Sequence, residues 1–171
     1  VEETIDPIRD KEIIDFELQL KDLETVEKRL EKVNRAAKTG DKQAVLEQAI
    51  LLKLKEVLES GNSVRSLEFN EKEKLFVDEF QMLTSKPVLY VCNVDESSAK
   101  KGNKYVDLVK QNVKSENAEV LILAVATESD IAELEDYDEQ QIFLEDIGLE
   151  EPGASRLIRA AYSLLNLQTY F

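Results

Sequence analysis

The stretch "PVLYVCNVDE", residues 87–96, decides the fold because an apolar run ends there at a polar loop. An uninterrupted apolar run after Pro87 is typical of a strand buried on both faces of a parallel sheet. A second run, "EVLILAV", lies at residues 119–125, and the segment between them, from Asn103 to about Ser115, has helical spacing. Strand, helix and strand together predict a βαβ unit with parallel strands. Because two strands make too small a sheet, we expect further strands outside this chain.

The first third of the chain predicts an antiparallel helical hairpin. Asp6 and Pro7 suit an N-cap and a first helical position. Apolar residues then recur at steps of three and four, at Phe16, Leu20, Leu23, Val26, Leu30, Val33 and Ala37. A stripe this narrow is typical of a coiled-coil seam. The residues 39–41 supply a stop and a new N-cap, and a second helix ends near Gly61. Such a short link makes the two helices antiparallel.

Shorter helices complete the predicted fold. Asn70 with Glu73 three residues later indicates a capping box, which opens a helix from 71 to about 83. Further helices are expected over about 139–147 and from Pro152 onward, and the final "LQTYF" resembles a strand. The predicted fold class is therefore α/β and mostly helical by residue count, with a parallel sheet and an inserted antiparallel coiled-coil hairpin.

Composition excludes several kinds of chemistry. The chain has 171 residues, no histidine and one cysteine, Cys92, so histidine-dependent triads and histidine zinc sites cannot form within it. A single cysteine fits a reducing compartment, and its apolar surroundings favour a small core residue over a reactive thiol. The net charge of −14 disfavours a protein that coats nucleic acid with its whole surface.

The loop Asn93-Val94-Asp95-Glu96 has two interpretations. Ligands of open α/β sheets bind beyond the carboxyl ends of the strands, where an Asn and a carboxylate three residues later can read a base. GTPases carry Asn-Lys-x-Asp at this point, and their Asp takes two N–H groups of guanine. Here Val94 replaces the Lys and Glu96 the Asp, which points away from guanine. Spacing alone favours an ordinary N-cap or turn.

Two more features have a functional and a purely structural interpretation. Ala124, Val125 and Ala126 end the second strand, where small residues let backbone N–H groups approach a ligand, or simply fit a strand–helix junction. Residues 28–42 carry six positive and two negative side chains. This basic tip of the hairpin can contact nucleic acid phosphates or be a solvated surface. Its cations are Lys28, Arg29, Lys32, Arg35, Lys38 and Lys42.

Long blocks of the sequence resemble one family in order. They are "DPIRD", "DLETVEKRLEKV", "KPVLYVCNVDE", "GNKYVDLVK", "AEVLILAVATESDIAEL" and "FLEDIGLEEPGASRLIRAAYSLLNLQTYF". Together they resemble the YchF subfamily of Obg-like P-loop ATPases, in the translation-factor-related class. The resemblance implies a partial G-domain-like fold and a chain that is the central fragment of a longer protein. Residues 1–15 and 66–166 would belong to the nucleotide-binding domain, residues 16–65 to the inserted hairpin, and residues 167–171 to the start of a TGS domain.

The resemblance also implies a function. The family has Asn-x-x-Glu where GTPases have Asn-Lys-x-Asp and prefers ATP, so Asn93, Val94 and Glu96 would bind adenine, with GTP also possible. Ala124, Val125 and Ala126 fall at the family's second base loop, where Ala124 replaces a Ser or Cys. The P-loop and the Mg²⁺ ligands would lie outside this chain, which alone is expected to be inactive. The protein would be a cytoplasmic monomer that binds ribosomes or RNA through the hairpin and the TGS cleft. The alternative is a non-enzymatic helical adaptor that binds RNA or protein through the hairpin tip.

Overall fold

The computed structural model describes residues 4–116, 118–168 and 170. It divides into two compact units. One, which we call the sheet unit, comprises the residues up to 8 and those from 87 onward. The other, the arm unit, comprises residues 9–86. The assignment of residues 1–15 and 66–166 to a nucleotide-binding domain, and of 16–65 to its insertion, stays a prediction.

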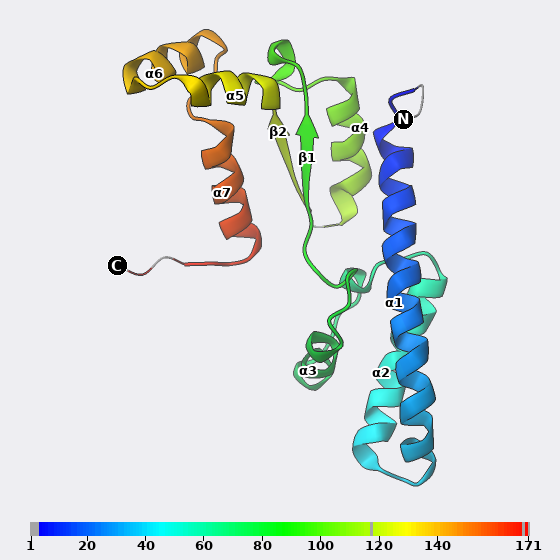
Figure 1. Ribbon diagram of the computed structural model, residues 1–171. Helices are drawn as coiled ribbons and strands as arrows, with labels where there is room; N and C mark the ends of the chain where they lie inside the picture. The colour runs from blue at the N-terminus through cyan, green and yellow to red at the C-terminus, as the bar shows by residue number, and fades with distance from the viewer. Residues whose placement is uncertain (1–3, 117, 169, 171) are drawn as a thin grey trace. The chain divides into compact units, whose positions relative to one another are not determined.

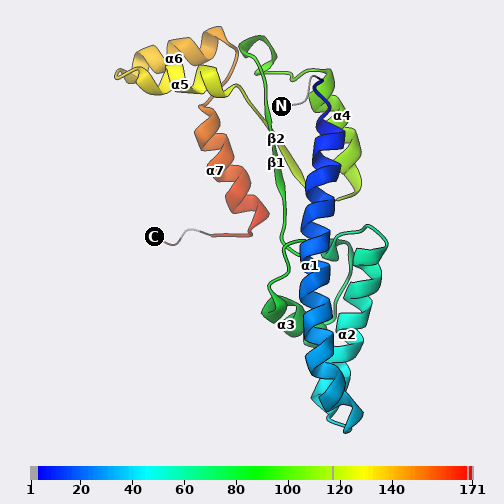
Figure 2. The same cartoon turned by 45° about the vertical axis from the view of Figure 1, so that its right-hand side comes forward.

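The arm unit is built on the helices α1 (Pro7–Lys38) and α2 (Lys42–Glu59), which lie side by side as a hairpin (Figures 1 and 2). The start of α1 at Pro7 and the end of α2 shortly before Gly61 agree with the sequence prediction. Asp41 is the N-cap of α2, and its carboxylate accepts hydrogen bonds from the backbone N–H groups of Gln43 and Ala44. The core between the helices consists of Val26 and Leu30 from α1 and of Ile50, Leu51, Leu54 and Leu58 from α2.

The predicted seam of α1 is wrong at its first two positions. Phe16 is 61% exposed and Leu20 is 46% exposed, whereas the polar residues Gln19 and Asp22 are buried. The helix turns these polar side chains inward because they satisfy backbone groups at the base of the hairpin. Gln19 donates to the carbonyl oxygen of Gly61, 3.2 Å away. From Leu23 onward the seam follows the prediction, and Val26 and Leu30 are buried.

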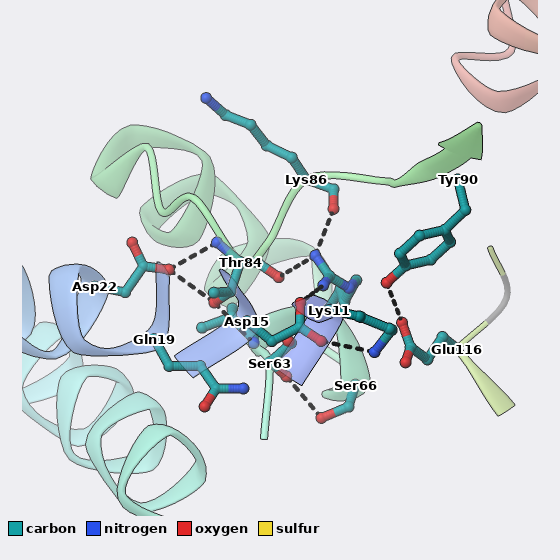
Figure 3. A network of polar contacts seen from close by, with 12 residues as sticks. Lys11, Asp15, Gln19, Asp22, Ser63, Ser66, Thr84, Lys86, Tyr90 and Glu116 are labelled. Carbon is teal, nitrogen blue, oxygen red and sulfur yellow. Dashed lines mark hydrogen bonds and ion pairs between the residues drawn. The ribbon is translucent and has the colours of Figure 1, made fainter. Parts of the chain in front are cut away.

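The buried carboxylate of Asp22 fixes the segment that leaves the arm (Figure 3). It accepts hydrogen bonds from the backbone N–H groups of Leu83, at 2.8 Å, and Thr84, at 2.7 Å. The Thr84 hydroxyl also donates to it at 2.7 Å, and accepts from the backbone N–H of Val64 at 3.1 Å. Arg65 then donates to the carbonyl oxygens of Thr84 and Lys86. Asp22 thus ties α1 to two loops distant in sequence.

Two short helices complete the arm unit. These are the 3-10 helix η1 (Val64–Ser66) and α3 (Glu71–Phe80). The capping box of Asn70 and Glu73 is confirmed, since each side chain bonds the other residue's backbone N–H. The helix ends at Phe80 rather than near residue 83, because Gln81 adopts a left-handed conformation with φ of 55°.

The sheet unit contains the predicted parallel pair, β1 (Leu89–Asn93) and β2 (Glu119–Leu123). Between them lie η2 (Glu96–Ser98), α4 (Lys104–Asn112) and η3 (Val113–Ser115). The helices α5 (Val125–Glu133), α6 (Tyr137–Asp146) and α7 (Gly153–Leu164) follow β2. Figures 1 and 2 show α4 on one side of the strands and α7 on the other. Helices account for most of the residues, so the predicted class is confirmed.

Two predictions at the end of this unit need correction. The second strand ends at Leu123, not at residue 125, because helix α5 begins directly after Ala124. The predicted final strand is not seen at residues 167, 168 and 170, and residues 169 and 171 lie outside the described part. In the described ranges, no helix is both long and apolar enough to cross a membrane.

Candidate functional site

The carboxyl ends of β1 and β2 meet at the same edge of the sheet. Asn93 and Leu123 are register partners, each the last residue of its strand. The backbone N–H of Val94 donates to the carbonyl oxygen of Leu123 at 2.8 Å. This bond extends the hydrogen bonding between the two strands by one residue. The two loops singled out in the sequence therefore start side by side, at the position where open α/β sheets bind ligands.

The Asn93 side chain bridges these loops. Its Oδ1 accepts a hydrogen bond from the backbone N–H of Val125 at 3.1 Å, across 32 positions of sequence. Val125 is the first residue of α5, whose N-terminus has no cap from its own N-cap residue Ala124. Asn93 thus caps this helix from the neighbouring strand. Its amide N–H₂ makes no hydrogen bond to another described residue and is exposed, so two donors are available to a ligand.

The two carboxylates of the first loop have different environments. Asp95 is the N-cap of η2 and accepts hydrogen bonds from the Ser98 backbone N–H at 2.9 Å and from the Ser97 hydroxyl at 2.8 Å. These bonds from Ser98 and Ser97 lower the pKa of Asp95 below its usual value. Glu96 is exposed, and its side chain makes no hydrogen bond or ion pair in the described part of the chain. The turn interpretation is therefore right for Asp95, and Glu96 is left able to accept from a ligand.

The second loop offers backbone rather than side chains. Ala124 is 3% exposed, whereas Val125 is 50% exposed and Ala126 is also at the surface. The first N–H groups of any α-helix lack partners within the helix, and the helix dipole makes this end favourable for acceptors. The Val125 N–H already donates to Asn93, and Ala126 is an exposed small residue whose N–H has no acceptor within the helix. The Asn93 side chain therefore joins the two loops, and the exposed Glu96 follows Asn93 in the first of them.

Neither metal binding nor thiol chemistry is indicated at this edge. Among the residues that the structure describes, no group of three His, Cys, Asp or Glu side chains is placed to hold a metal ion. Cys92 lies in β1 and is half-buried. Its burial raises the pKa of the thiol, partly offset by the charge of Lys110. The thiol is therefore less reactive at neutral pH than an exposed cysteine.

The basic residues of the hairpin tip fall into two groups. Lys28 pairs with Glu24 at 3.9 Å. Arg29 lies over the ring of Phe80, 4.6 Å from its centroid, and 3.9 Å from a carboxylate oxygen of Glu47. The other four cations are exposed and have no ion pair within the described ranges: Lys32, Arg35, Lys38 and Lys42. The structure therefore uses Arg29 for internal packing, whereas these four side chains lie exposed at the surface of the hairpin.

One contact near the loops is not predicted from the sequence. Both carboxylate oxygens of Glu128, in α5, accept from the backbone N–H of Gly153, each at 2.7 Å. The two residues are 25 positions apart, so no local spacing signals the contact. The Pro152-Gly153 pair signals only a helix start.

Comparisons with known proteins give consistent matches. The chain is 50% identical to the ribosome-binding ATPase YchF of Bacillus subtilis over 98% of its own length and 46% of that protein. It is 30% identical to Obg-like ATPase 1 of Caenorhabditis elegans, covering 44% of it. The solved structure of the Schizosaccharomyces pombe YchF GTPase superposes with a TM-score of 0.86 at 29% identity, over 97% of this chain and 46% of that one. No family model matches.

These matches confirm the resemblance seen in the sequence. They also show that the chain spans less than half the length of the relatives that it matches. The names of these relatives differ in the nucleotide, since the bacterial protein is called an ATPase and the yeast protein a GTPase.

Proposed function

Because this chain is homologous to the YchF and Obg-like ATPases over nearly its whole length, we propose that it is part of a nucleotide-hydrolysing protein of that kind. In this protein it supplies the base-recognition loops and the helical arm. The observation that carries the proposal is the Asn93–Val125 hydrogen bond, which joins the two strand-end loops into one surface. The bacterial relative's name supports an ATPase that binds ribosomes.

The donors and acceptors of this surface suit adenine. The Asn93 amide N–H₂ is left to donate to a purine ring nitrogen, because its Oδ1 accepts from Val125. Glu96 offers an exposed acceptor, which suits the exocyclic amine of adenine. Guanine presents a carbonyl oxygen at the corresponding position, where a carboxylate is unfavourable. The Val94 backbone and the loop of Ala124, Val125 and Ala126 complete the base site. In this loop the Ala126 N–H is the donor for the base, because the Val125 N–H donates to Asn93. We therefore assign ATP as the preferred nucleotide, with GTP bound less well.

The rest of the chemistry belongs to residues outside this chain. Phosphoryl transfer from ATP to water depends on phosphate binding by a P-loop and on Mg²⁺. The sequence has no Gly-x-x-x-x-Gly-Lys-Ser/Thr stretch, so this chain alone should select the base and not hydrolyse the nucleotide. A ribosome-associated function places the protein in the cytoplasm, and we propose a monomer.

Replacing Asn93 with Ala in the full-length protein that contains this sequence should weaken ATP binding about tenfold, the effect of losing one well-placed hydrogen bond and the loop bridge. Isothermal titration calorimetry with ATP measures this. Asn112→Ala is the matched control, since Asn112 is exposed and makes no capping bond with its side chain. Unchanged ATP affinity in Asn93→Ala would rule out base reading by this loop.

The hairpin tip favours a second activity, the binding of RNA phosphates on the ribosome. The exposed cations are Lys32, Arg35, Lys38 and Lys42. A local cluster of cations, here at the end of α1 and the start of α2, can neutralise several phosphates even when the whole chain is acidic. If the chain is instead a non-enzymatic adaptor, this arm would carry the whole function and nucleotide would have no effect on binding.

Reversing two of these charges, in Arg35→Glu/Lys38→Glu, should weaken ribosome co-sedimentation and reduce the slope of log K against log salt by about 2, roughly one for each lost phosphate contact. Lys72→Glu/Lys74→Glu on α3 is the matched control, because it changes the net charge equally at exposed positions of the arm unit. Equal weakening by both pairs would mean that only net charge matters and that the tip is not a binding surface.

A further inference from the structure

The N-terminus of helix α7 is capped by a residue of another helix. Its own N-cap residue, Pro152, provides no side-chain hydrogen bond. The carboxylate of Glu128, in α5, takes this place and accepts from the backbone N–H of Gly153 with both oxygens at 2.7 Å. A carboxylate at a helix N-terminus is favoured by both the free N–H groups and the helix dipole. The contact therefore joins α5 to α7.

Glycine is needed at position 153 for this contact. A Cβ atom there would lie 2.4 Å from Cδ2 of Leu123 and 2.5 Å from Oε1 of Glu128, closer than van der Waals contact allows. Leu123 is the last residue of β2 and is buried. The missing side chain thus lets the start of α7 pack directly on the end of β2 and on Glu128.

Glu128 is one helical turn from the second base loop. Its backbone N–H donates to the carbonyl oxygen of Ala124 at 2.9 Å, which forms the first turn of α5. On the other side of that turn, the N–H of Val125 donates to Asn93. The first turn of α5 is therefore held at two points, by Asn93 of β1 and, through Glu128, by the N-terminus of α7. Thr127, between them, is 4% exposed.

We propose that Glu128 is a positioning residue for base recognition, a proposal that rests on the function proposed above. By anchoring the first turn of α5 to Gly153, it keeps this turn in place, with the Val125 N–H on Asn93 and the next N–H, of Ala126, directed to the base. We place Glu128 behind the base site and not in contact with the nucleotide, because its carboxylate lies against the Gly153 N–H at the start of α7. Its loss should therefore reduce the contribution of the base to binding and leave phosphate binding unchanged.

The test compares two ligands on the full-length protein, ATP and inorganic tripolyphosphate, which has no base. In Glu128→Ala the ratio of ATP affinity to tripolyphosphate affinity should fall about tenfold, as expected for the loss of a hydrogen-bonded anchor. Glu128→Gln keeps one acceptor oxygen and should recover part of the ratio. Glu133→Ala, at the exposed end of the same helix, should leave it at the wild-type value.

The outcomes separate the two proposals. An unchanged ratio in Glu128→Ala overturns the role of Glu128 while leaving the base site intact. A parallel fall in affinity for both ligands also overturns it, because the residue would then act on general stability alone. If the wild-type protein binds ATP no better than tripolyphosphate, the proposed base site itself is wrong.

Discussion

Replacing Asp22 with Ala should lower the free energy of unfolding by about 3 kcal/mol. The Asp22 carboxylate is 2% exposed and accepts from two backbone N–H groups, of Leu83 and Thr84, and from the Thr84 hydroxyl. Its removal leaves those donors without an acceptor, at roughly 1–3 kcal/mol for each buried group. Relief of the cost of burying a charge offsets part of this loss, which keeps the expected value below the simple sum.

Urea unfolding of the chain, followed by circular dichroism, measures the change. The matched control is Glu24→Ala, two residues along the same helix. The Glu24 side chain is 55% exposed and forms ion pairs with the exposed Lys21 and Lys28, so its removal should cost less than about 0.5 kcal/mol. If Asp22→Ala were no more destabilising than Glu24→Ala, the network in Figure 3 would not hold the base of the arm together.

Asp22 also shows where prediction of the buried helix face from the apolar pattern fails. Apolar periodicity placed the seam of α1 correctly where the two helices pack through Val26 and Leu30. It failed at Phe16 and Leu20, because at the base of the hairpin the helix faces backbone groups of loops from residues 61 and 83–84. Such groups need polar partners, and a hydrophobic pattern carries no information about them. Helix ends with strong local signals, at Pro7, Asp41 and Asn70, were predictable because a cap is a contact within a few residues.

The candidate site also has features that the sequence predicts and features that it does not. The parallel strands and the place of Asn93 at a strand end followed from two apolar runs. Asp95 caps a turn, while the Glu96 side chain has no partner among the described residues. This difference could not be predicted from the sequence, because both residues are acids in the same loop. The bridge from Asn93 to Val125 and the anchor from Glu128 to Gly153 depend on contacts over 32 and 25 positions. Such contacts require the packed fold.

The sharpest expected change in specificity comes from converting the first loop to the GTPase pattern. Val94→Lys/Glu96→Asp gives the loop the Asn-Lys-x-Asp order, in which the Lys stem packs on the base and the Asp takes two N–H groups of guanine. The same change removes the acceptor that we assign to the amine of adenine. Each of these effects should contribute roughly tenfold, so the ratio of ATP affinity to GTP affinity should fall about 100-fold. Ser97→Ala, in the same loop, should leave the ratio unchanged, because the Ser97 hydroxyl only supports Asp95.

The measurement that tests the base site most directly is calorimetric titration of the full-length protein and of Val94→Lys/Glu96→Asp with ATP and with GTP. Recognition of adenine by Asn93 and Glu96 predicts that the wild-type protein binds ATP more tightly and that the variant reverses this preference. Equal affinities for the two nucleotides in the wild-type protein, or a ratio that the double substitution leaves unchanged, would contradict it.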